Sequence, residues 1–408
     1  MTDLLFAGLK QPVRFFRCPM LLGQVRRFFH SWPHEEVTPS PGGAVIHVRA
    51  FGREEKGYDI RAPWLPEPLH EPTMASALCS LAIELVAAFG EEHPDVTCLH
   101  AAAVQIGGNT VLLLGDNRAG KSTLVARLMA QGQLSLGDDL IGVTPQGELL
   151  SFGIPPRLRL PLPPSAALAA FARTYKGIRD DRYQYLQAAC GLCAPFGQRA
   201  LPTHIVILQR RGTESARFLP LEHRSGLMQL LPHYVMRRGS AETVLSQASQ
   251  LIREIPALMF RYSNLDEGCD ALLHRLEAAP SAPAAPLPPA GFPLPSPAEQ
   301  QRGPLSRACF IQAPGTRLRV KHGNTFLLDG ASDRVYGLNS LGKALWNLLE
   351  EPLSEAEAAF LLQEAFPHAE KQQIAHDVAE LFSLLKAEGL IVEPKPQPSL
   401  PPREQALL

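Results

Sequence analysis

The chain has little charge and almost no charge imbalance. Asp, Glu, Lys and Arg make up 19% of its 408 residues, and the formal net charge at pH 7 is −1. Nucleic acids and anionic membranes attract proteins with a strong positive charge, so the composition gives no global electrostatic reason to expect either partner. We therefore expect no nucleic acid and no membrane among the partners of this protein.

Cysteines are few and scattered, with seven along the whole chain. An odd number at irregular spacing argues against a disulfide framework. Cys190 and Cys193 form one C-x-x-C pair, but a tetrahedral zinc site needs four ligands, and no second pair stands at a suitable spacing. A redox role needs a thioredoxin-like context, which the sequence does not have. Structural or incidental cysteines are the favoured interpretation.

Long apolar runs are also missing. No uninterrupted stretch approaches the ~20 residues that span a bilayer, and the first residues, MTDLLFAGLKQPVRFF, lack an apolar run followed by a cleavage site. The thirteen histidines show no H-E-x-x-H or comparable pairing. The sequence predicts a cytoplasmic location and leaves a homo-oligomer open.

Proline is abundant, with 38 residues. Nine of them fall in residues 280–304, where helix and sheet hydrogen bonds cannot propagate, so we expect a semi-rigid linker. At about 3.1 Å per residue such a linker can reach about 75 Å. A second proline-rich stretch, 395–408, is predicted to be a disordered tail. Between the two, residues 305–394 form a separate predicted domain.

Strand and helix patterns alternate before the linker, which is typical of an α/β fold. Residues 1–95 contain two strand-like segments, 42–52 and 57–62, and an apolar helix over 73–90. The alternation continues over residues 96–279, where we expect a layered α/β domain. Its predicted strands are 110–114, 134–136, 204–209 and 257–263, with a hairpin from 140–143 and 148–152, and its predicted helices are 121–131, 241–255 and 265–279.

The segment LLLGDNRAGKSTL follows a predicted strand and matches the pattern G-x-x-x-x-G-K-S/T. Glycines in this pattern let main-chain N–H groups turn inward around phosphate oxygens, and the positive end of the next helix adds to the attraction. Lys121 can reach the β- and γ-phosphates of ATP, and the Ser122 hydroxyl can ligate Mg²⁺. Because a strand precedes the loop and an apolar helix face follows it, phosphate binding is favoured over an accidental glycine turn. The predicted nucleotide-binding residues are Gly115, Asp116, Asn117, Arg118, Ala119, Gly120, Lys121, Ser122 and Thr123.

Two adjacent acids, Asp138 and Asp139, come after the loop, and Asp138 follows Lys121 by 17 residues. If the strand before the acids neighbours the strand before the loop, the pair lies beside the phosphates. Adjacent carboxylates on an extended chain point to opposite sides, so one can face a metal and the other an acceptor hydroxyl. Phosphoryl transfer uses both groups. The alternative is that the pair only caps a turn before the hairpin.

Residues 99–143 resemble the catalytic core of HPr kinase/phosphorylase and its related proteins. The shared pattern is Leu-His, a β-hairpin, the phosphate loop, one helix and an Asp-Asp pair. The resemblance implies that Asp138 acts as base toward an acceptor serine and that Asp139 helps to bind the metal. It also matches His100 to a histidine near the active site of the family. A strand-edge residue with a satisfied ring is the alternative for His100.

The sequence departs from that family after the acids. The glycine-rich signature is absent, and SFGIPPRLRLPLPPS stands in its place, which resembles related kinases of peptide-modification gene clusters. We therefore do not expect the HPr carrier protein as acceptor. Arg157 and Arg159 are candidate clamps for the transferred phosphate, although a solvated strand face is preferred. Arg182, Tyr183 and Tyr185 are candidate contacts to a base or acceptor, with packing preferred for the tyrosines.

The segment after the linker resembles a PqqD-type peptide-binding domain over nearly its whole length. It shows a strand pair, Arg317–Val320 and Asn324–Leu328, then three helical patterns and a last short strand, in a winged-helix-like α/β unit. Trp346 stands at core spacing in the first helix. The resemblance implies that the leader of a ribosomally made precursor peptide adds as an edge strand, with its seat at Arg317–Leu328.

A DNA-binding winged helix is the alternative for this segment. Only a few basic residues lie near the wing, and no basic recognition helix is present, so a peptide partner is preferred. The sequence as a whole predicts a P-loop α/β kinase that uses ATP and Mg²⁺ to phosphorylate a hydroxyl, with serine preferred, on a recruited peptide or small protein. The alternatives are a nucleotide-gated recruitment adaptor and a nucleotide hydrolase.

Overall fold

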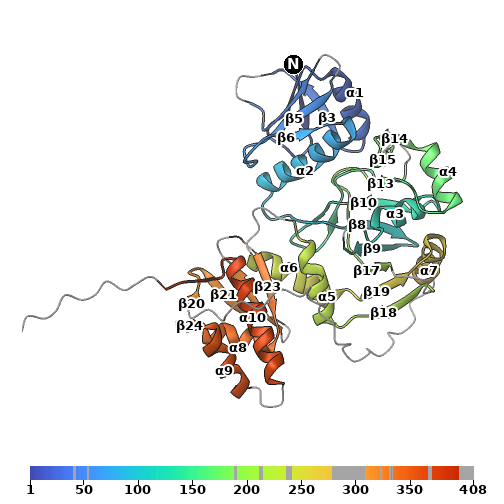
Figure 1. The fold of residues 1–408 in the computed structure, drawn as a ribbon. Helices are drawn as coiled ribbons and strands as arrows, with labels where there is room; N and C mark the ends of the chain where they lie inside the picture. The colour runs from blue at the N-terminus through green and yellow to red at the C-terminus, as the bar shows by residue number, and fades with distance from the viewer. Residues whose placement is uncertain are drawn as a thin grey trace, which may run out of the picture. The chain divides into compact units, whose positions relative to one another are not determined.

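The computed structural model contains two compact units, Met1–Pro289 and Ala290–Leu408, which are described separately (Figure 1). The predicted linker at 280–304 and tail at 395–408 lie outside the described residues, as do Asn117 and Cys190. The structure describes residues 1–39, 43–52, 55–116, 118–187, 191–210, 215–235, 241–277, 308–321, 324–329, 332, 334–365 and 370–394.

The first unit begins with a six-stranded sheet in the order β3-β1-β2-β4-β5-β6. Neighbouring strands are antiparallel except β2 and β4, which run parallel. Two of these strands, β4 and β5, were predicted, whereas the shorter ones carry too little periodic pattern to be recognised. The elements are β1 (Thr2–Phe6), β2 (Val13–Phe16), α1 (Pro19–Phe28), β3 (His34–Val37), β4 (Ile46–Phe51), β5 (Gly57–Arg61), β6 (Leu69–Glu71) and α2 (Met74–Glu92).

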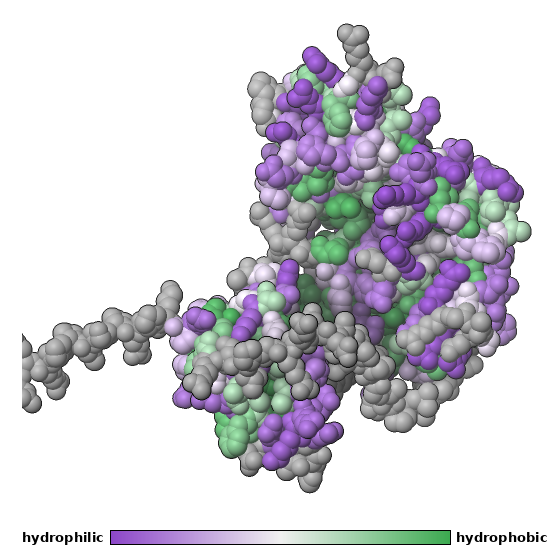
Figure 2. Space-filling model, viewed as in Figure 1, coloured by the Kyte–Doolittle hydropathy of each residue, from purple (hydrophilic) through white to green (hydrophobic). Residues whose placement is uncertain are grey.

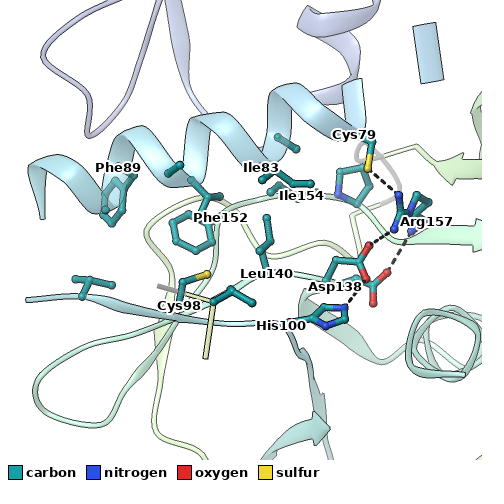
Figure 3. A pocket seen from close by; sticks show the side chains of 18 of the residues that line it. Cys79, Ile83, Phe89, Cys98, His100, Asp138, Leu140, Phe152, Ile154 and Arg157 are labelled. Carbon is teal, nitrogen blue, oxygen red and sulfur yellow. Dashed lines mark hydrogen bonds and ion pairs between the residues drawn. The ribbon is translucent and has the colours of Figure 1, made fainter. Parts of the chain in front are cut away.

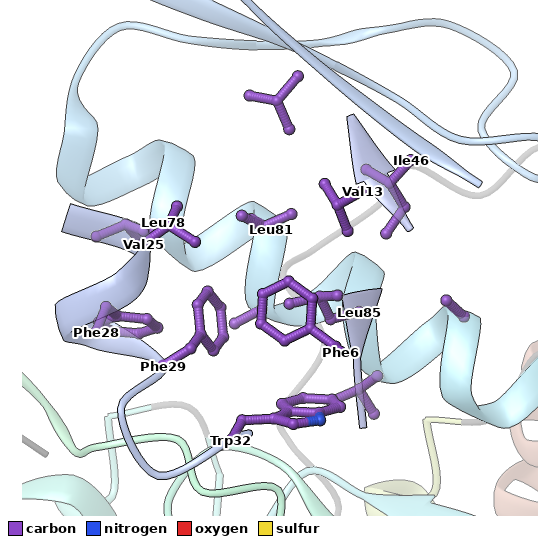
Figure 4. Packing of buried hydrophobic residues seen from close by; sticks show 14 of the residues in the cluster. Phe6, Val13, Val25, Phe28, Phe29, Trp32, Ile46, Leu78, Leu81 and Leu85 are labelled. Atoms are coloured by element: carbon purple, nitrogen blue, oxygen red, sulfur yellow. The ribbon is translucent and has the colours of Figure 1, made fainter. Parts of the chain in front are cut away.

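Helix α2 begins at a capping box, in which the Thr73 side chain accepts from the amide of Ser76 and the Ser76 hydroxyl accepts from the amide of Thr73. Among the described residues it is the one helix long and apolar enough to cross a membrane, and 56% of its apolar window is buried inside the protein. Core helices of globular proteins share this composition. The buried side of α2, including Leu78, Leu81 and Leu85, packs on the first sheet (Figure 4).

The core around Trp32 joins the first sheet to the rest of the unit. Trp32 is fully buried and packs edge-on against Phe6 and Phe29. Its other neighbours come from later in the chain, because Phe196 stacks on its ring at 4.7 Å and Phe152 lies 5.7 Å away. One continuous apolar cluster therefore contains both the N-terminal sheet and residues beyond 150.

The second sheet of this unit carries the phosphate loop and has the order β10-β8-β9-β17-β19-β18. Its strands β9, β17 and β19 run parallel, and the strands outside them are antiparallel. Apolar side chains of α3, α4 and α7 pack together against the sheet strands. The elements are β8 (Ala102–Ile106), β9 (Asn109–Leu114), α3 (Lys121–Met129), β10 (Leu134–Gly137), α4 (Ala166–Thr174), β17 (His204–Arg210), β18 (Arg217–Pro220), α5 (His223–Leu230), α6 (Ala241–Glu254), β19 (Ala257–Tyr262) and α7 (Leu265–Glu277).

Two small sheets complete the unit, in the orders β16-β12-β11-β7 and β13-β15-β14. The predicted hairpin is present, with β11 antiparallel to β12. The predicted strands and helices of the second sheet are also confirmed, within one or two residues at most ends. The elements of the small sheets are β7 (Thr97–Leu99), β11 (Ile141–Val143), β12 (Leu149–Leu150), β13 (Arg157–Arg159), β14 (Lys176–Arg179), β15 (Tyr183–Leu186) and β16 (Arg199–Ala200).

In the described residues of the second unit there are two three-stranded sheets, β24-β20-β25 and β21-β22-β23, and three helices. Trp346 is buried among Leu345, Leu349 and Phe382, so its predicted place in the core is confirmed. The predicted hairpin is the antiparallel pair β21 and β22. The elements are β20 (Cys309–Gln312), β21 (Thr316–Lys321), β22 (Asn324–Asp329), β23 (Arg334–Leu338), α8 (Ser340–Leu348), β24 (Leu353–Ser354), α9 (Glu355–Ala365), α10 (Lys371–Ala387) and β25 (Ile391–Val392).

Candidate active site

The phosphate loop connects the end of β9 to the start of α3, as the motif predicts. Gly115 has φ +152° and Gly120 has φ +98°, and Arg118 between them also has a positive φ. A Cβ on Gly115 would lie 2.9 Å from Ala119 Cβ and 3.0 Å from the Leu208 carbonyl oxygen. The loop therefore requires glycine at this position for both its dihedral and its space. Its backbone is built as a tight turn at a helix N-terminus, the arrangement that binds phosphate.

Lys121 lies inside the loop. Its Nζ donates a hydrogen bond to the Gly115 carbonyl oxygen at 2.7 Å, and the residue is buried. Burial lowers the pKa of Lys121, while the charges of Asp139 and Asp138 act in the opposite direction. The lysine and the two acids are thus close enough to interact, as the sequence spacing predicts. The lysine charge is held where a phosphate would enter the loop.

Asp138 follows the last residue of β10 and is 1% exposed. Its Oδ2 accepts a hydrogen bond from the Arg157 amide at 3.2 Å, whereas Oδ1 is buried and has no partner among the residues that the structure describes. Burial and the neighbouring Asp139 charge raise the pKa of Asp138 to about 7, although the nearby Ser122 hydroxyl and Arg157 act to lower it. A carboxylate with a free oxygen and a pKa near neutrality suits a general base.

Asp139 lies in a different environment. Its Oδ2 is 3.0 Å from Arg157 Nη2 and its Oδ1 is 3.7 Å from His100 Nε2. Burial raises the pKa of Asp139, but the interaction with His100 and the charge of Arg157 outweigh this effect, and the pKa is lowered overall. The pKa values of the two adjacent acids are therefore shifted in opposite directions. In such a pair one carboxyl group can accept a proton while the other stays ionised.

The acids do not sit on extended chain, and this part of the sequence interpretation is wrong. Strand β10 ends at Gly137 with an irregular register against β8, and Asp139 has φ +65°, in the left-handed region. A bend, and not the alternation of a strand, sends the two carboxylates to different partners. The alternative of a turn before the hairpin is correct for the backbone, but the side chains also face Lys121 and Arg157.

Arg157 is the residue whose role the sequence predicts least well. We expected a solvated strand face for Arg157 and Arg159, and this holds for the exposed Arg159 only. The Arg157 guanidinium contacts Asp139, donates to Cys79 Sγ and lies 4.7 Å from the Tyr183 ring centre. Cys79 comes from α2, 78 residues earlier, so no local signal marks it.

The tyrosines and Arg182 behave as packing and surface residues. Tyr185 is buried and packs edge-on against Phe28 at 4.7 Å, which confirms the packing interpretation. Arg182 is exposed, and its amide donates to Asp180 Oδ1. Tyr185 also lines the cavity that contains Asp138 and Asp139.

His100 lies beside a second histidine that sequence reasoning did not identify. The His100 amide donates to the His233 carbonyl oxygen at 2.7 Å, and the ring centres are 6.3 Å apart. Burial, together with the charges of Lys121 and His100, lowers the pKa of His233 to about 4. His233 is therefore neutral at physiological pH. Its position next to β7 depends on a contact across more than 130 residues.

A cavity of about 410 Å³ opens beside the acids (Figure 3). Its polar end contains His100, Asp138, Asp139 and Arg157, and its remaining walls are mostly apolar. Helix α2 forms one wall, and residues near β7 and β11 form the opposite wall. The apolar residues labelled in the view are Ile83, Phe89, Leu140, Phe152 and Ile154.

The residues present fit a magnesium nucleotide. Mg²⁺ is usually held by one or two carboxylates together with phosphate oxygens and water. Ser122 and Asp139 are donors of this kind, and a third protein ligand is not required. Within the described ranges, no group of three or more His, Cys, Asp and Glu side chains is arranged to hold a metal alone. The Ser122 hydroxyl lies beside Asp138, so hydroxyl and carboxylate oxygens are present next to the loop.

Comparison with known proteins supports one of the two predicted resemblances directly. Residues 324–391 match the family described as Coenzyme PQQ synthesis protein D (PqqD), which confirms a PqqD domain near the C-terminus. No curated protein sequence matches the chain. Among solved structures, the chain is similar to the Hpr(Ser) kinase/phosphatase from Coxiella burnetii, with 13% identity and a TM-score of 0.23, over 44% of this chain and 91% of that one. This likeness is too weak to carry the kinase interpretation, which depends on the site geometry.

Proposed function

We propose that this protein is an ATP-dependent kinase that transfers a phosphoryl group to a hydroxyl, most simply that of serine, on a peptide or small protein. The observation that carries the proposal is Asp138. It is a buried acid with one oxygen free of partners among the described residues, a raised pKa, and a place between a phosphate loop and an open cavity. An aspartate that only caps a turn does not require this combination of burial, a free oxygen and a raised pKa.

Different residues of the chain bind the phosphates and the metal. Main-chain amides of the loop, the N-terminus of α3 and the Lys121 ammonium bind the phosphates of the substrate ATP. Ser122 and Asp139 are the groups that would hold Mg²⁺, which when bound neutralises charge on the phosphates. His100 and Arg157 keep Asp139 in place and ionised. In this scheme His100 acts as a positioning residue.

The transfer step balances without a further reactant. The acceptor hydroxyl oxygen forms a bond to the γ-phosphorus while the bond from that phosphorus to the β–γ bridging oxygen breaks. ADP leaves with the electron pair of the broken bond, and the hydroxyl proton passes to Asp138. Both products are then released, and Asp138 returns its proton to water.

The PqqD domain supplies the reason to expect a peptide acceptor in ribosomal-peptide modification. We infer that the Ala290–Leu408 unit binds part of the acceptor, with the β21–β22 hairpin as the candidate seat. A module tethered through the proline-rich sequence 280–304 raises the effective concentration of its bound peptide at the other unit. Weak binding at each unit then suffices for transfer.

The test uses the full chain, Mg²⁺, γ-labelled ATP and small synthetic peptides that contain one serine. Label on the peptide, lost in Asp138→Asn and kept in Asp270→Asn, supports the kinase. Asp270 is an exposed acid on α7, so its substitution controls for loss of one negative charge. Nucleotide binding without turnover indicates a recruitment adaptor, and free phosphate without labelled peptide indicates a hydrolase.

A further inference from the structure

The cavity beside Asp138 extends well beyond what a hydroxyl and a phosphate need. From the acids it follows α2, which contributes Cys79, Ile83, Val86, Ala87 and Gly90. These positions recur at three- and four-residue spacing and therefore form one stripe along the helix. Space-filling colouring shows apolar residues gathered in a hollow of the first unit below α2 (Figure 2).

The stripe remains partly open in this unit. Ile83 is 46% exposed although its neighbours Ala82 and Leu85 are buried. The opposite wall is also apolar, with Val96, Leu140 and Val235 among its residues. An open groove with two apolar walls is unfavourable in water, and it becomes favourable when an apolar ligand fills it.

The dimensions of the groove fit a short stretch of extended peptide. From Cys79 to Gly90 the helix rises about 16 Å at ~1.5 Å per residue. An extended chain covers that distance with about five residues at ~3.3 Å each. The groove is thus long enough for the residues on one side of an acceptor hydroxyl that lies at Asp138.

We propose that this groove is the acceptor-peptide subsite, and that it selects a hydroxyl residue flanked on one side by large apolar residues such as Leu, Ile or Phe. The inference rests on the proposed function, because it places the hydroxyl at Asp138. Acidic flanking residues are disfavoured, since Asp138 and Asp139 lie at the polar end, Glu91 also lines the groove, and the other walls are mostly apolar and would desolvate a charge. A peptide fits better than a free acyl chain because the groove is continuous with the transfer residues and the same chain carries a PqqD domain.

Gly90 allows a precise test. It lies in α2 and lines the groove, and a Cβ built on it meets no atom within 4 Å. Gly90→Leu therefore adds a side chain whose Cβ meets no atom of the protein, while Gly90→Ala is the matched control. Ile83→Gln removes apolar surface nearer to the acids, and Leu201→Gln makes the same kind of change at an exposed position that does not line the groove.

The probes are fluorescein-labelled synthetic peptides with one serine, flanked on either side by Leu and Phe, by Gly, or by Asp. Binding to the full chain with MgADP is measured by fluorescence polarisation, and transfer is measured with γ-labelled ATP. We expect tighter binding and faster transfer for peptides with an apolar flank on one side. Ile83→Gln should weaken that binding about tenfold or more, the effect of losing one buried apolar side chain. Gly90→Leu should weaken it because the new side chain occupies part of the groove, whereas the two controls should not.

The outcomes separate this inference from the proposed function. Apolar-selective binding that Gly90→Leu abolishes, without transfer to any peptide, supports the groove and overturns the kinase. Transfer with no preference for apolar flanks overturns the groove and supports the kinase. Binding that Gly90→Leu leaves unchanged overturns the groove, and the transfer assay then decides on the kinase by itself. Displacement of all three peptide classes equally by decanoate identifies an acyl chain as the occupant and also overturns the inference.

Discussion

Arg157 contacts the two acids of the site through different groups. Its guanidinium Nη2 lies 3.0 Å from Asp139 Oδ2, while its backbone amide donates to Asp138 Oδ2 at 3.2 Å. The side-chain charge is therefore directed at one carboxylate, and the other receives only a neutral donor at close range. This asymmetry, together with the deeper burial of Asp138, accounts for pKa shifts of opposite direction in two adjacent residues.

The first prediction concerns that guanidinium. Arg157→Met removes the positive charge that lowers the pKa of both acids, so the acidic limb of the transfer rate against pH should move to higher pH. The measurement is the pH profile of kcat/KM for peptide labelling. Arg159→Met, on the same strand but exposed, should leave the limb in place. A loss of activity with an unshifted limb would point to a purely structural role.

The second prediction is the pH dependence of the native protein. A general base works only when deprotonated, and the pKa of Asp138 is raised to about 7 by burial and by Asp139. Transfer should rise with pH below about 7 and level off above it. Asp138→Asn should lower transfer by about 10²–10⁴-fold at the plateau and should keep nucleotide binding. A flat profile between pH 5 and 9 would contradict the assignment of the base.

The third prediction follows from the same pKa in terms of stability. The folded-state pKa of Asp138 lies above the unfolded value, so its contribution is favourable at low pH and is lost as pH rises through about 7. Asp138→Asn should therefore raise the free energy of unfolding at pH 8, by a few kcal/mol at most. Urea unfolding at pH 5 and pH 8 measures this. The gain should be larger at pH 8, and a loss at both pH values would show that the ionised carboxylate is structural.

The sequence predicted the local part of this site well and the long-range part poorly. The phosphate loop followed from the positions of Gly115 and Gly120, because few residues can adopt their dihedrals, and the strand and helix around it have clear periodicity. That Lys121 lies near the acid pair was predictable because only one helix and one short strand separate them in the sequence. The contacts of Arg157 with Cys79, and of His100 with His233, depend on packing between distant segments.

The N-terminal sheet shows the same limit. Strands such as β3 and β6 have three or four residues and little alternation of apolar and polar positions, so pattern alone could not identify them. Helix α2 was predicted from its composition. The sequence did not predict that one face of this helix would lie beside the two acids. That property arises because the first sheet and α2 pack on Phe152 and Phe196.

The fourth prediction tests the loop independently of transfer. Lys121→Met keeps the aliphatic stem that is buried in the loop and removes the ammonium. It should weaken binding of a fluorescent ATP analogue by tenfold or more, because a charge-assisted contact to phosphate contributes about 1.5–3 kcal/mol. Lys176→Met, at an exposed position of β14, is the control. Unchanged binding in Lys121→Met would remove the loop from the nucleotide site.

The fifth prediction concerns the joint between the first sheet and the rest of the unit. Trp32 is fully buried, and it contacts Phe6 and Phe29 on one side and Phe152 and Phe196 on the other. Trp32→Ala should destabilise the protein by about 3–5 kcal/mol, as expected for a large core aromatic. Met20→Ala, which truncates an exposed side chain, should have little effect.

The shape of the unfolding transition shows whether Trp32→Ala destabilises the first sheet alone or the whole Met1–Pro289 unit. If the first sheet were an independent domain, Trp32→Ala would shift only one of two transitions, and ATP-analogue binding would survive the first. Because Phe152 both contacts Trp32 and lines the groove, we expect instead that nucleotide binding, peptide binding and far-ultraviolet circular dichroism of the Met1–Pro289 unit are lost together. Groove and phosphate loop would then share one cooperative core, and a change at Trp32 would act on both.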